Sequence, residues 1–162
     1  MQLRKDFDQD LYNEHNSSGC QKGARLLSLM GFTNVVIKEE DFTYDLDALD
    51  PDGNPVKIEI EKRASEKHFD TNWRSGYKEG LNIPQKRKIT NGEVDLFIST
   101  HPKLWRFILV DKRALNESVA RGSQPSPNKY SRTEEFFQVP YSDVTKIEII
   151  DNKVVYQPIR PF

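Results

Sequence analysis

One stretch of the sequence, residues 44–63 (YDLDALDPDGNPVKIEIEKR), predicts a β-hairpin of fixed register and so limits the possible folds more than any other segment. Apolar and charged residues alternate on both sides of DPDGN at residues 50–54, as they do in half-buried strands. Proline suits the second position of a type I turn, and glycine suits the left-handed residue that follows in a three-residue loop. This loop places Leu46 opposite Ile58 and Asp45 opposite Glu59.

The register separates the apolar and acidic side chains of the hairpin onto two faces, because successive side chains of a strand alternate. The apolar face is expected to hold Tyr44, Leu46, Ile58 and Ile60, and the acidic face Asp45, Asp47, Glu59 and Glu61. Lys57 lies opposite Asp47 and balances its charge. Asp45 opposite Glu59 is a pair of like charges, which destabilises a sheet unless something compensates.

A divalent cation is the compensation that suits this pair of carboxylates best. Mg²⁺ is typically held by one or two carboxylates together with water and the phosphate oxygens of a substrate. The two carboxylates therefore predict a site for Mg²⁺ or Mn²⁺. Two plain alternatives stay open: a solvated polar sheet face without a ligand, or a register displaced by one residue.

Charge changes sign along the chain directly after the hairpin, although the whole chain has a net charge of only -1. Residues 39–61 contain nine acidic residues and one basic residue, whereas residues 62–88 contain eight basic and three acidic residues. The basic stretch also holds Trp73 and Tyr77, which are able to stack on bases or sugars. Because phosphate backbones are bound mainly by Lys and Arg, this order suits a site where a cation meets a nucleic acid. An ordinary solvated helix and loop is the alternative.

The composition is that of a folded, soluble protein. With 162 residues, 36% of them hydrophobic and 30% charged, the chain predicts a single domain over residues 1–162 with a real core. We expect a cytoplasmic protein without membrane contact, because no stretch approaches the roughly 20 apolar residues of a membrane span. Cys20 is the only cysteine, which excludes an internal disulfide and a cysteine-based zinc cluster.

Periodicity and turn residues predict an alternating order of helices and strands for the rest of the chain. A helix after Ser17 is expected to end at Gly31, followed by a strand at 34–38 and then by the hairpin. Residues 69–81 are expected to form an irregular or helical crossover, and a helix is expected to begin at Pro84. Further expected elements are strands at 94–99, 107–111, 136–139, 146–150 and 154–159, helices at 112–119 and 141–144, and a loop at 121–133. This order predicts an α/β fold with a mixed sheet and helices packed against it.

A helix ending in Gly31, a strand, Asp45, the hairpin and Glu59-Ile60-Glu61 together resemble the PD-(D/E)XK nuclease superfamily, which has the restriction-endonuclease-like fold. The resemblance covers about residues 17–111 and leaves residues 112–162 as a C-terminal β-rich extension. Members carry an Asp on the second core strand and Glu-x-Lys on the third, with x apolar, and Asp45, Glu59 and Ile60 match. Glu61 stands at the lysine position, as in the Glu-x-Glu variant known among restriction enzymes. Gln21 stands where many members have a glutamate in the first helix.

The resemblance implies a metal-dependent endonuclease that hydrolyses phosphodiester bonds, with DNA as the expected substrate. Asp45 and Glu59 would hold Mg²⁺ or Mn²⁺, and Glu61 would be a third ligand or the general base for the attacking water. Some members take the missing lysine from the following helix; Lys86 and Lys88 lie there, and we favour Lys88 for contact with the phosphate. The residues expected to bind nucleic acid are Lys62, Arg63, Arg74, Lys86 and Arg87.

Two other functional interpretations remain open at this level. The same fold with a degenerate site would bind nucleic acid or a protein without cutting, and Glu61 in place of lysine favours that alternative. A structural or interaction protein would use the acidic hairpin only as a solvated face. If the protein does cut both strands of a duplex symmetrically, we expect a homodimer whose two-fold axis matches the site.

Overall fold

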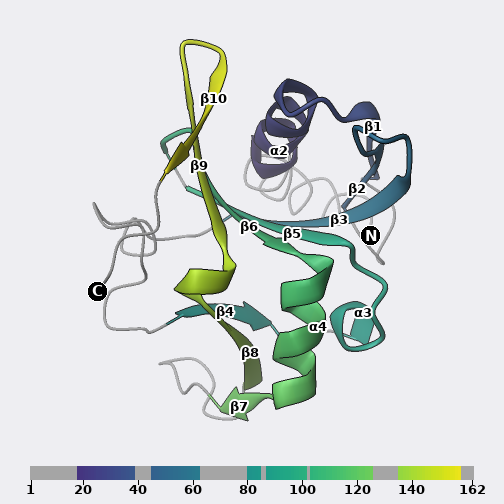
Figure 1. Cartoon of the computed structure of the whole chain (residues 1–162), viewed down its shortest axis with the longest axis vertical. Coiled ribbons are helices and arrows are strands. Elements are labelled where there is room, and N and C mark those ends of the chain that lie inside the picture. Colours follow the sequence, from purple (N-terminus) through teal and green to yellow (C-terminus); the bar gives the residue numbers. More distant parts are fainter. Residues whose placement is uncertain are drawn as a thin grey trace, which may run out of the picture.

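The computed structural model describes residues 18–38, 45–62, 80–84, 87–101, 103–125 and 135–157. Seven strands form the main sheet, in the order β1-β2-β3-β5-β6-β9-β10. All neighbours in this sheet are antiparallel except β3 and β5, which are parallel, so the sheet is mixed (Figure 1). The strands are β1 (Thr33–Ile37), β2 (Leu46–Leu49), β3 (Pro55–Lys62), β5 (Leu96–Thr100), β6 (Arg106–Asp111), β9 (Thr145–Ile150) and β10 (Lys153–Gln157).

A second, three-stranded sheet has the order β4-β8-β7. Its strands are β4 (Gly80–Pro84), β8 (Glu135–Pro140) and β7 (Gln124–Pro125), and the helical elements are α2 (Ser18–Leu29), α3 (Arg87–Thr90), α4 (Lys112–Arg121) and the 3₁₀ turn η3 (Tyr141–Asp143). Figure 1 shows α2 on one side of the main sheet, and α3, α4 and the small sheet on the other. The described part of the chain is therefore an α/β structure in which both faces of the main sheet are covered.

Two apolar clusters, one on each face, hold these layers together. On the α2 face, Leu26 and Leu27 pack with residues of the central strands, among them Leu46, Ile58 and Ile98. On the other face, Phe97, Ile108 and Val110 pack with Leu115 of α4 and Phe137 of the small sheet. Neighbouring residues of β6 belong to opposite clusters, because successive side chains of a strand point to opposite faces. This double burial explains why residues 107–110 are continuously apolar.

The hairpin and the first helix agree with the sequence predictions. Leu46 pairs with Ile58 and Asp47 with Lys57, so the predicted register is confirmed for these pairs. The helix ends in a Schellman motif: Gly31 has φ 93° and donates to Ser28 O at 3.2 Å, and Phe32 N donates to Leu27 O at 2.9 Å. Asp47 also forms an ion pair with Lys38, with 3.4 Å between Oδ2 and Nζ.

The prediction for residues 80–84 was wrong. An irregular or helical crossover up to residue 81 and a helix from Pro84 were expected, but residues 80–84 form β4, and the helix begins at Arg87. β4 is stabilised by its antiparallel pairing with β8, and Leu81 and Ile83 are buried in the core. A side chain at Gly80 would collide with the carbonyl oxygen of Val139, so this close approach requires glycine. The partner strand lies far along the chain, so the local sequence did not reveal it.

The remaining expected elements are found with small shifts at their ends. Strands occur at 96–100, 106–111, 135–140, 145–150 and 153–157, and the predicted helix at 112–119 continues to Arg121. β7 occupies part of the expected 121–133 loop, and residues 126–133 lie outside the described residues. Within the described ranges no helix is long and apolar enough to cross a membrane.

Candidate active site

The centre of the candidate site is Glu59, in the middle of the main sheet. Its strand, β3, lies between β2 and β5, and Ile58 and Ile60 on either side of it pack against the α2 face. Glu59 therefore points to the face covered by α3 and α4, where only 3% of the residue is exposed. A carboxylate this deeply buried is costly unless a hydrogen bond or an opposite charge compensates.

Lys88 supplies that charge. It lies in the short helix α3, and its Nζ forms an ion pair with Glu59 Oε2. The side chains of Lys88 and Glu59 are only 14% and 5% exposed, so water screens their attraction little. The helix is held in place by buried Ile89 and by a hydrogen bond of 2.8 Å from Glu93 N to Lys88 O. The structure thus brings together the glutamate and the lysine that the sequence singled out.

Asp45 contacts the backbone of the residues on either side of Glu59 but is not opposite Glu59 in a regular ladder. The ladder of β2 and β3 begins at Leu46 and Ile58, one residue further on. Asp45 Oδ2 instead accepts a hydrogen bond of 2.7 Å from the backbone N–H of Ile60. Its own N–H donates to Ile58 O at 2.9 Å. The expected repulsion between two directly opposed carboxylates is therefore relieved by this hydrogen bond and by Lys88, so it does not by itself require a metal.

Glu61 continues the polar side of β3 beyond Glu59. It pairs with Ser99 of β5, which pairs with Ile108 of β6, and Ile108 pairs with Lys146 of β9. Residues paired across a sheet share a face, so this row of side chains lies on the same face as Glu59. Glu61 is partly buried.

Lys146 belongs to the same face and was not singled out from the sequence. It is 2% exposed, and its Nζ lies 5.3 Å from the centroid of the Tyr141 ring, a cation–π contact. The only available signal was the alternation in TKIEII, which places Lys146 and Glu148 on one side of the strand. A buried cation on this face adds positive charge to the side of the sheet that carries Glu59 and Glu61.

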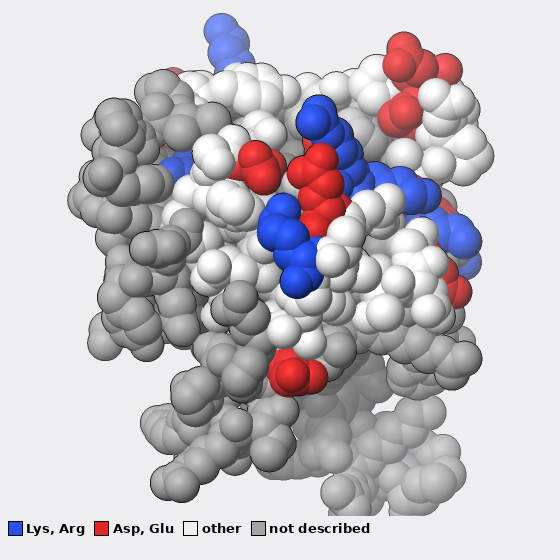
Figure 2. All heavy atoms as spheres, turned by 60° about the horizontal axis from the view of Figure 1, so that its bottom comes forward, with Lys and Arg blue, Asp and Glu red and all other residues white. Residues whose placement is uncertain are grey.

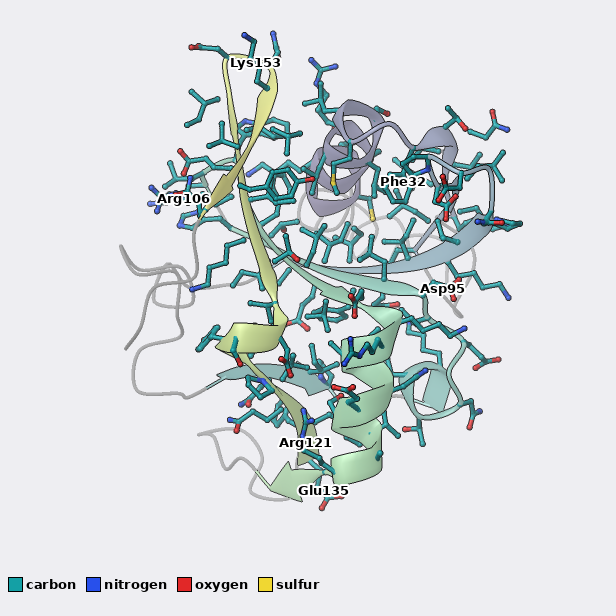
Figure 3. The ribbon with its side chains drawn as sticks, viewed as in Figure 1. Phe32, Asp95, Arg106, Arg121, Glu135 and Lys153 are labelled. Atoms are coloured by element: carbon teal, nitrogen blue, oxygen red, sulfur yellow. The ribbon has the colours of Figure 1, made fainter. Side chains whose placement is uncertain are left out.

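Asp95 fixes the start of β5 beside β3. Its Oδ2 accepts the backbone N–H of Lys57 at 2.8 Å, and its own N–H donates to Lys57 O at 2.8 Å. Its Oδ1 accepts from Lys112 Nζ at 3.0 Å. Figure 3 shows Asp95 on the side of the molecule where α3 and the start of α4 lie. These contacts lock the parallel register that brings Phe97 and Ser99 alongside Glu59 and Glu61.

Several residues expected to bind nucleic acid are not placed by the structure. Arg63, Arg74 and Lys86 lie outside the described residues, as do Trp73 and Tyr77. The backbones of Lys62 and Arg87 belong to β3 and α3, but their side chains lie outside what is described. Figure 2 shows Lys and Arg interspersed with Asp and Glu on the face that carries α4, so the described residues of this face form no uniformly basic area.

The described residues do not by themselves form a complete metal site. Among the described residues, no group of three or more His, Cys, Asp or Glu is arranged to hold a metal ion. A structural Zn²⁺ site takes about four protein ligands and Ca²⁺ takes about six to eight oxygens, so neither suits these residues. Mg²⁺ is commonly held by one or two carboxylates while water and substrate complete its shell. In the structure one oxygen of Asp45 accepts from Ile60 N, and one oxygen of Glu59 is paired with Lys88.

Comparison with protein-family models, with curated proteins and with solved structures found no match to this chain.

Proposed function

We propose that this protein is a Mg²⁺-dependent nuclease that hydrolyses phosphodiester bonds in DNA on a restriction-endonuclease-like scaffold. The order of the described elements supports the scaffold. A helix precedes three antiparallel strands, and the next strand of the main sheet, β5, runs parallel to the third and lies beside it. This order contains the helix, the strand and the hairpin on which the resemblance of the sequence to PD-(D/E)XK nucleases rests.

One observation carries the proposal: Lys88 of α3 contacts the carboxylate of Glu59 on β3. The family's usual lysine position is occupied by Glu61, so an active site needs a cation from another element. Lys88 is separated from Glu59 by many residues, and its ammonium group nevertheless forms an ion pair with that carboxylate. A positive charge there is suited to bind a phosphate oxygen and to stabilise the charge that develops during hydrolysis.

Each residue of the site then has a distinct role. Asp45 and Glu59 would hold Mg²⁺, which when bound polarises the phosphate and lowers the pKa of water. Lys88 donates hydrogen bonds to a non-bridging oxygen of the phosphate. Glu61 accepts a proton from the attacking water. The hydrogen bond from Ile60 N fixes one oxygen of Asp45, so the carboxylate keeps a defined orientation toward the end of β3.

A binding module without catalysis is the second candidate, and the same ion pair favours it. Lys88 already balances the charge of Glu59, so the described residues do not require a metal for electrostatic reasons. Such a protein would hold nucleic acid with its basic residues and leave the phosphodiester bond intact. The two candidates differ in a single readout, which is cleavage in the presence of a divalent ion.

The test is an incubation of the purified protein with supercoiled plasmid, single-stranded DNA and structured RNA in Mg²⁺, Mn²⁺ or EDTA. Asp45→Asn, Glu59→Gln and Lys88→Gln change the charge or hydrogen bonding of each group while keeping similar shapes. Glu117→Gln on α4 is the matched control, because Glu117 is an exposed carboxylate paired with Arg113. We expect metal-dependent cleavage of DNA by the native protein and by Glu117→Gln, and a loss of at least about a hundredfold in the other three.

Each other outcome has a definite meaning, provided that circular dichroism shows the variants to be folded. Cleavage that survives in Asp45→Asn and Glu59→Gln would place the activity elsewhere and overturn the assignment of the site. Binding of nucleic acid without cleavage in any metal would establish the second candidate. Cleavage of RNA alone would keep the site and change the substrate. A duplex cut on both strands would call for a homodimer, which sedimentation of the complex would detect.

A further inference from the structure

A second polar surface lies on the α2 face of the main sheet, opposite the face to which Glu59 points. It is a groove of about 320 Å³ lined by Arg25, Trp105, Ile149, Asp151 and Asn152, and it is called the Trp105 groove below. Arg25 comes from α2, Trp105 from the turn between β5 and β6, and the other three from the β9–β10 hairpin. Figure 1 shows this hairpin rising beside α2. A volume above about 300 Å³ is large enough for a ring-sized ligand.

Trp105 is exposed in a way that needs an explanation. The residue is 42% exposed, and its neighbour Leu104 is 47% exposed, so two large apolar side chains face solvent at one turn. Phe107 packs near the ring at a centroid distance of 6.4 Å, and Lys22 Nζ lies 5.4 Å from the ring centroid. Exposed aromatic residues with cations beside them are typical of surfaces that stack nucleic-acid bases.

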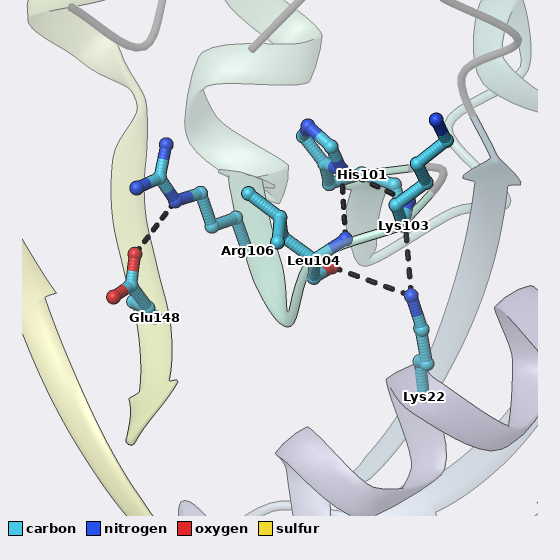
Figure 4. Close-up of polar contacts among 6 residues, drawn as sticks. All are labelled: Lys22, His101, Lys103, Leu104, Arg106 and Glu148. Atoms are coloured by element: carbon cyan, nitrogen blue, oxygen red, sulfur yellow. Dashed lines mark hydrogen bonds and ion pairs between the residues drawn. The ribbon is translucent and has the colours of Figure 1, made fainter. Parts of the chain in front are cut away.

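Several hydrogen bonds anchor the described residues of the turn that carries Trp105. His101 is buried, and its Nδ1 accepts the backbone N–H groups of Lys103 at 3.0 Å and Leu104 at 2.8 Å (Figure 4). Lys22 of α2 donates to the carbonyl oxygens of His101 at 3.4 Å and Leu104 at 3.3 Å (Figure 4). Ile149 N donates to Trp105 O at 2.9 Å. The indole is thus presented by a fixed backbone, which lowers the entropy cost of binding.

The polar groups of the groove match the parts of a nucleotide. Arg25 Nη2 donates to the neutral Asn152 Oδ1 at 3.0 Å, and within the described residues no carboxylate forms an ion pair with this guanidinium. Arg25 therefore keeps a charge and free donors for a phosphate. Asp151 and Asn152 form the hairpin turn with φ of 52° and 61°, and their carboxylate and amide are able to bond to the edge of a base. An apolar peptide anchor would leave all three groups unmatched.

We propose that the Trp105 groove binds one base of an unpaired nucleic-acid strand. The indole of Trp105 stacks on the base, Asp151 and Asn152 contact its edge, and Arg25 contacts the adjacent phosphate. A paired base is not free to stack on the indole, so a single strand is favoured over a duplex. The inference goes beyond the proposed function and does not depend on it, because it concerns binding on the face of the sheet opposite the catalytic residues.

The test uses the full chain with Trp73→Phe, which leaves Trp105 as the only tryptophan, in EDTA so that no strand is cut. The probes are oligo-dT and oligo-rU of about ten nucleotides, a duplex of equal length, and inorganic polyphosphate. We expect single strands of either sugar type to quench Trp105 fluorescence to saturation, and polyphosphate to bind with little quenching. Equal quenching by polyphosphate, or none by either oligonucleotide, would overturn the proposal.

Variants separate stacking from charge, with affinities measured by anisotropy of a labelled strand. Trp105→Leu is expected to weaken binding about tenfold, whereas Trp105→Phe, which keeps an aromatic ring, stays within about threefold. Arg25→Gln is expected to weaken binding about fivefold. It should also reduce the slope of the logarithm of the binding constant against the logarithm of the salt concentration by about one. Arg113→Gln on the opposite face removes the same charge and should change little. Unchanged binding in both Trp105→Leu and Arg25→Gln would contradict the proposal.

Binding in the Trp105 groove and cleavage at Glu59 are tested separately by two variants. Glu59→Gln is expected to lose cleavage and to keep its affinity for single strands, since it lies on the other face of the sheet. Trp105→Leu is expected to lose affinity whether or not the native protein cuts. The outcome that favours a peptide is also defined. If an apolar peptide changes Trp105 fluorescence and oligonucleotides do not compete with that peptide, the groove binds a peptide and the inference is overturned.

Discussion

Removing the ammonium group of Lys88 should destabilise the protein far more than removing an exposed cation does. Lys88→Met keeps the length and much of the volume of the side chain but leaves Glu59 with its buried charge uncompensated. The two side chains are 14% and 5% exposed, so the pair belongs to the buried class. Breaking such a pair from one side costs about 3 to 5 kcal/mol, because the remaining charge stays buried.

An exposed ion pair on α4 is the reference for the loss of stability expected in Lys88→Met. Arg113 and Glu117 form an ion pair on α4 with 3.1 Å between Nε and Oε1, but their side chains are 87% and 46% exposed. An exposed pair at this helical spacing contributes about 0.3 to 0.5 kcal/mol. Arg113→Met should therefore lower Tm by less than about 2 °C, whereas Lys88→Met should lower it by roughly 6 to 20 °C.

The assay is urea unfolding of a double-mutant cycle made of Lys88→Met, Glu59→Gln and the combined variant. The double variant has no buried charge at the pair and should be more stable than Lys88→Met alone, with a coupling of about 2 kcal/mol or more.

A small effect would refute the reasoning. If Lys88→Met costs no more than Arg113→Met, the ion pair with Glu59 is not a buried interaction in solution. If the cycle shows no coupling, Lys88 stabilises the protein through its aliphatic chain alone. Either result would remove the main physical support for Lys88 as the lysine of the site.

Three further substitutions test the packing that positions the two surfaces. Gly23→Ala should lower the free energy of unfolding by about 1 kcal/mol although alanine favours helices, because its Cβ would lie 2.5 Å from Ile60 Cδ1. Adding Ile60→Val should recover most of that loss, as measured by urea unfolding. His101→Leu removes the acceptor for two backbone N–H groups and should cost about 1 to 3 kcal/mol, and a loss no greater than that of a surface substitution would contradict the role given to Nδ1. Asp111→Ala removes the N-cap bond of 2.9 Å to Ala114 N and should cost about 1 kcal/mol by thermal melting, whereas Asp111→Asn should cost less.

The local part of the fold was predictable because its signals are local. The DPDGN turn and the alternation around it are contained in about twenty residues, and they give the correct pairing of Leu46 with Ile58. Gly31 likewise ends α2 through hydrogen bonds to residues of the last helical turn. β4 was missed because its pairing with β8 joins distant parts of the chain, and Pro84 by itself suggested the start of a helix.

The site was predictable only where its signals are local in the sequence. Alternation assigned Glu59 to the face opposite Ile58 and Ile60, and the structure places it there. The position of Asp45 was not predictable, since the hydrogen bond to Ile60 N takes it out of the regular ladder. The role of His101 in holding its turn was also missed, because a histidine that accepts two backbone N–H groups leaves no recognisable pattern in the sequence.

Metal binding tests the central claim most directly, because it needs no knowledge of the substrate. The measurement is a titration of the purified protein with Mn²⁺, followed by the electron paramagnetic resonance signal of the free ion. We predict saturable binding by the native protein, loss of that binding in the Asp45→Asn, Glu59→Gln double variant, and tighter binding in Lys88→Gln, where no ammonium group competes for Glu59. Binding that persists unchanged in the double variant, or no binding by the native protein or Lys88→Gln, would contradict a metal site formed by Asp45 and Glu59.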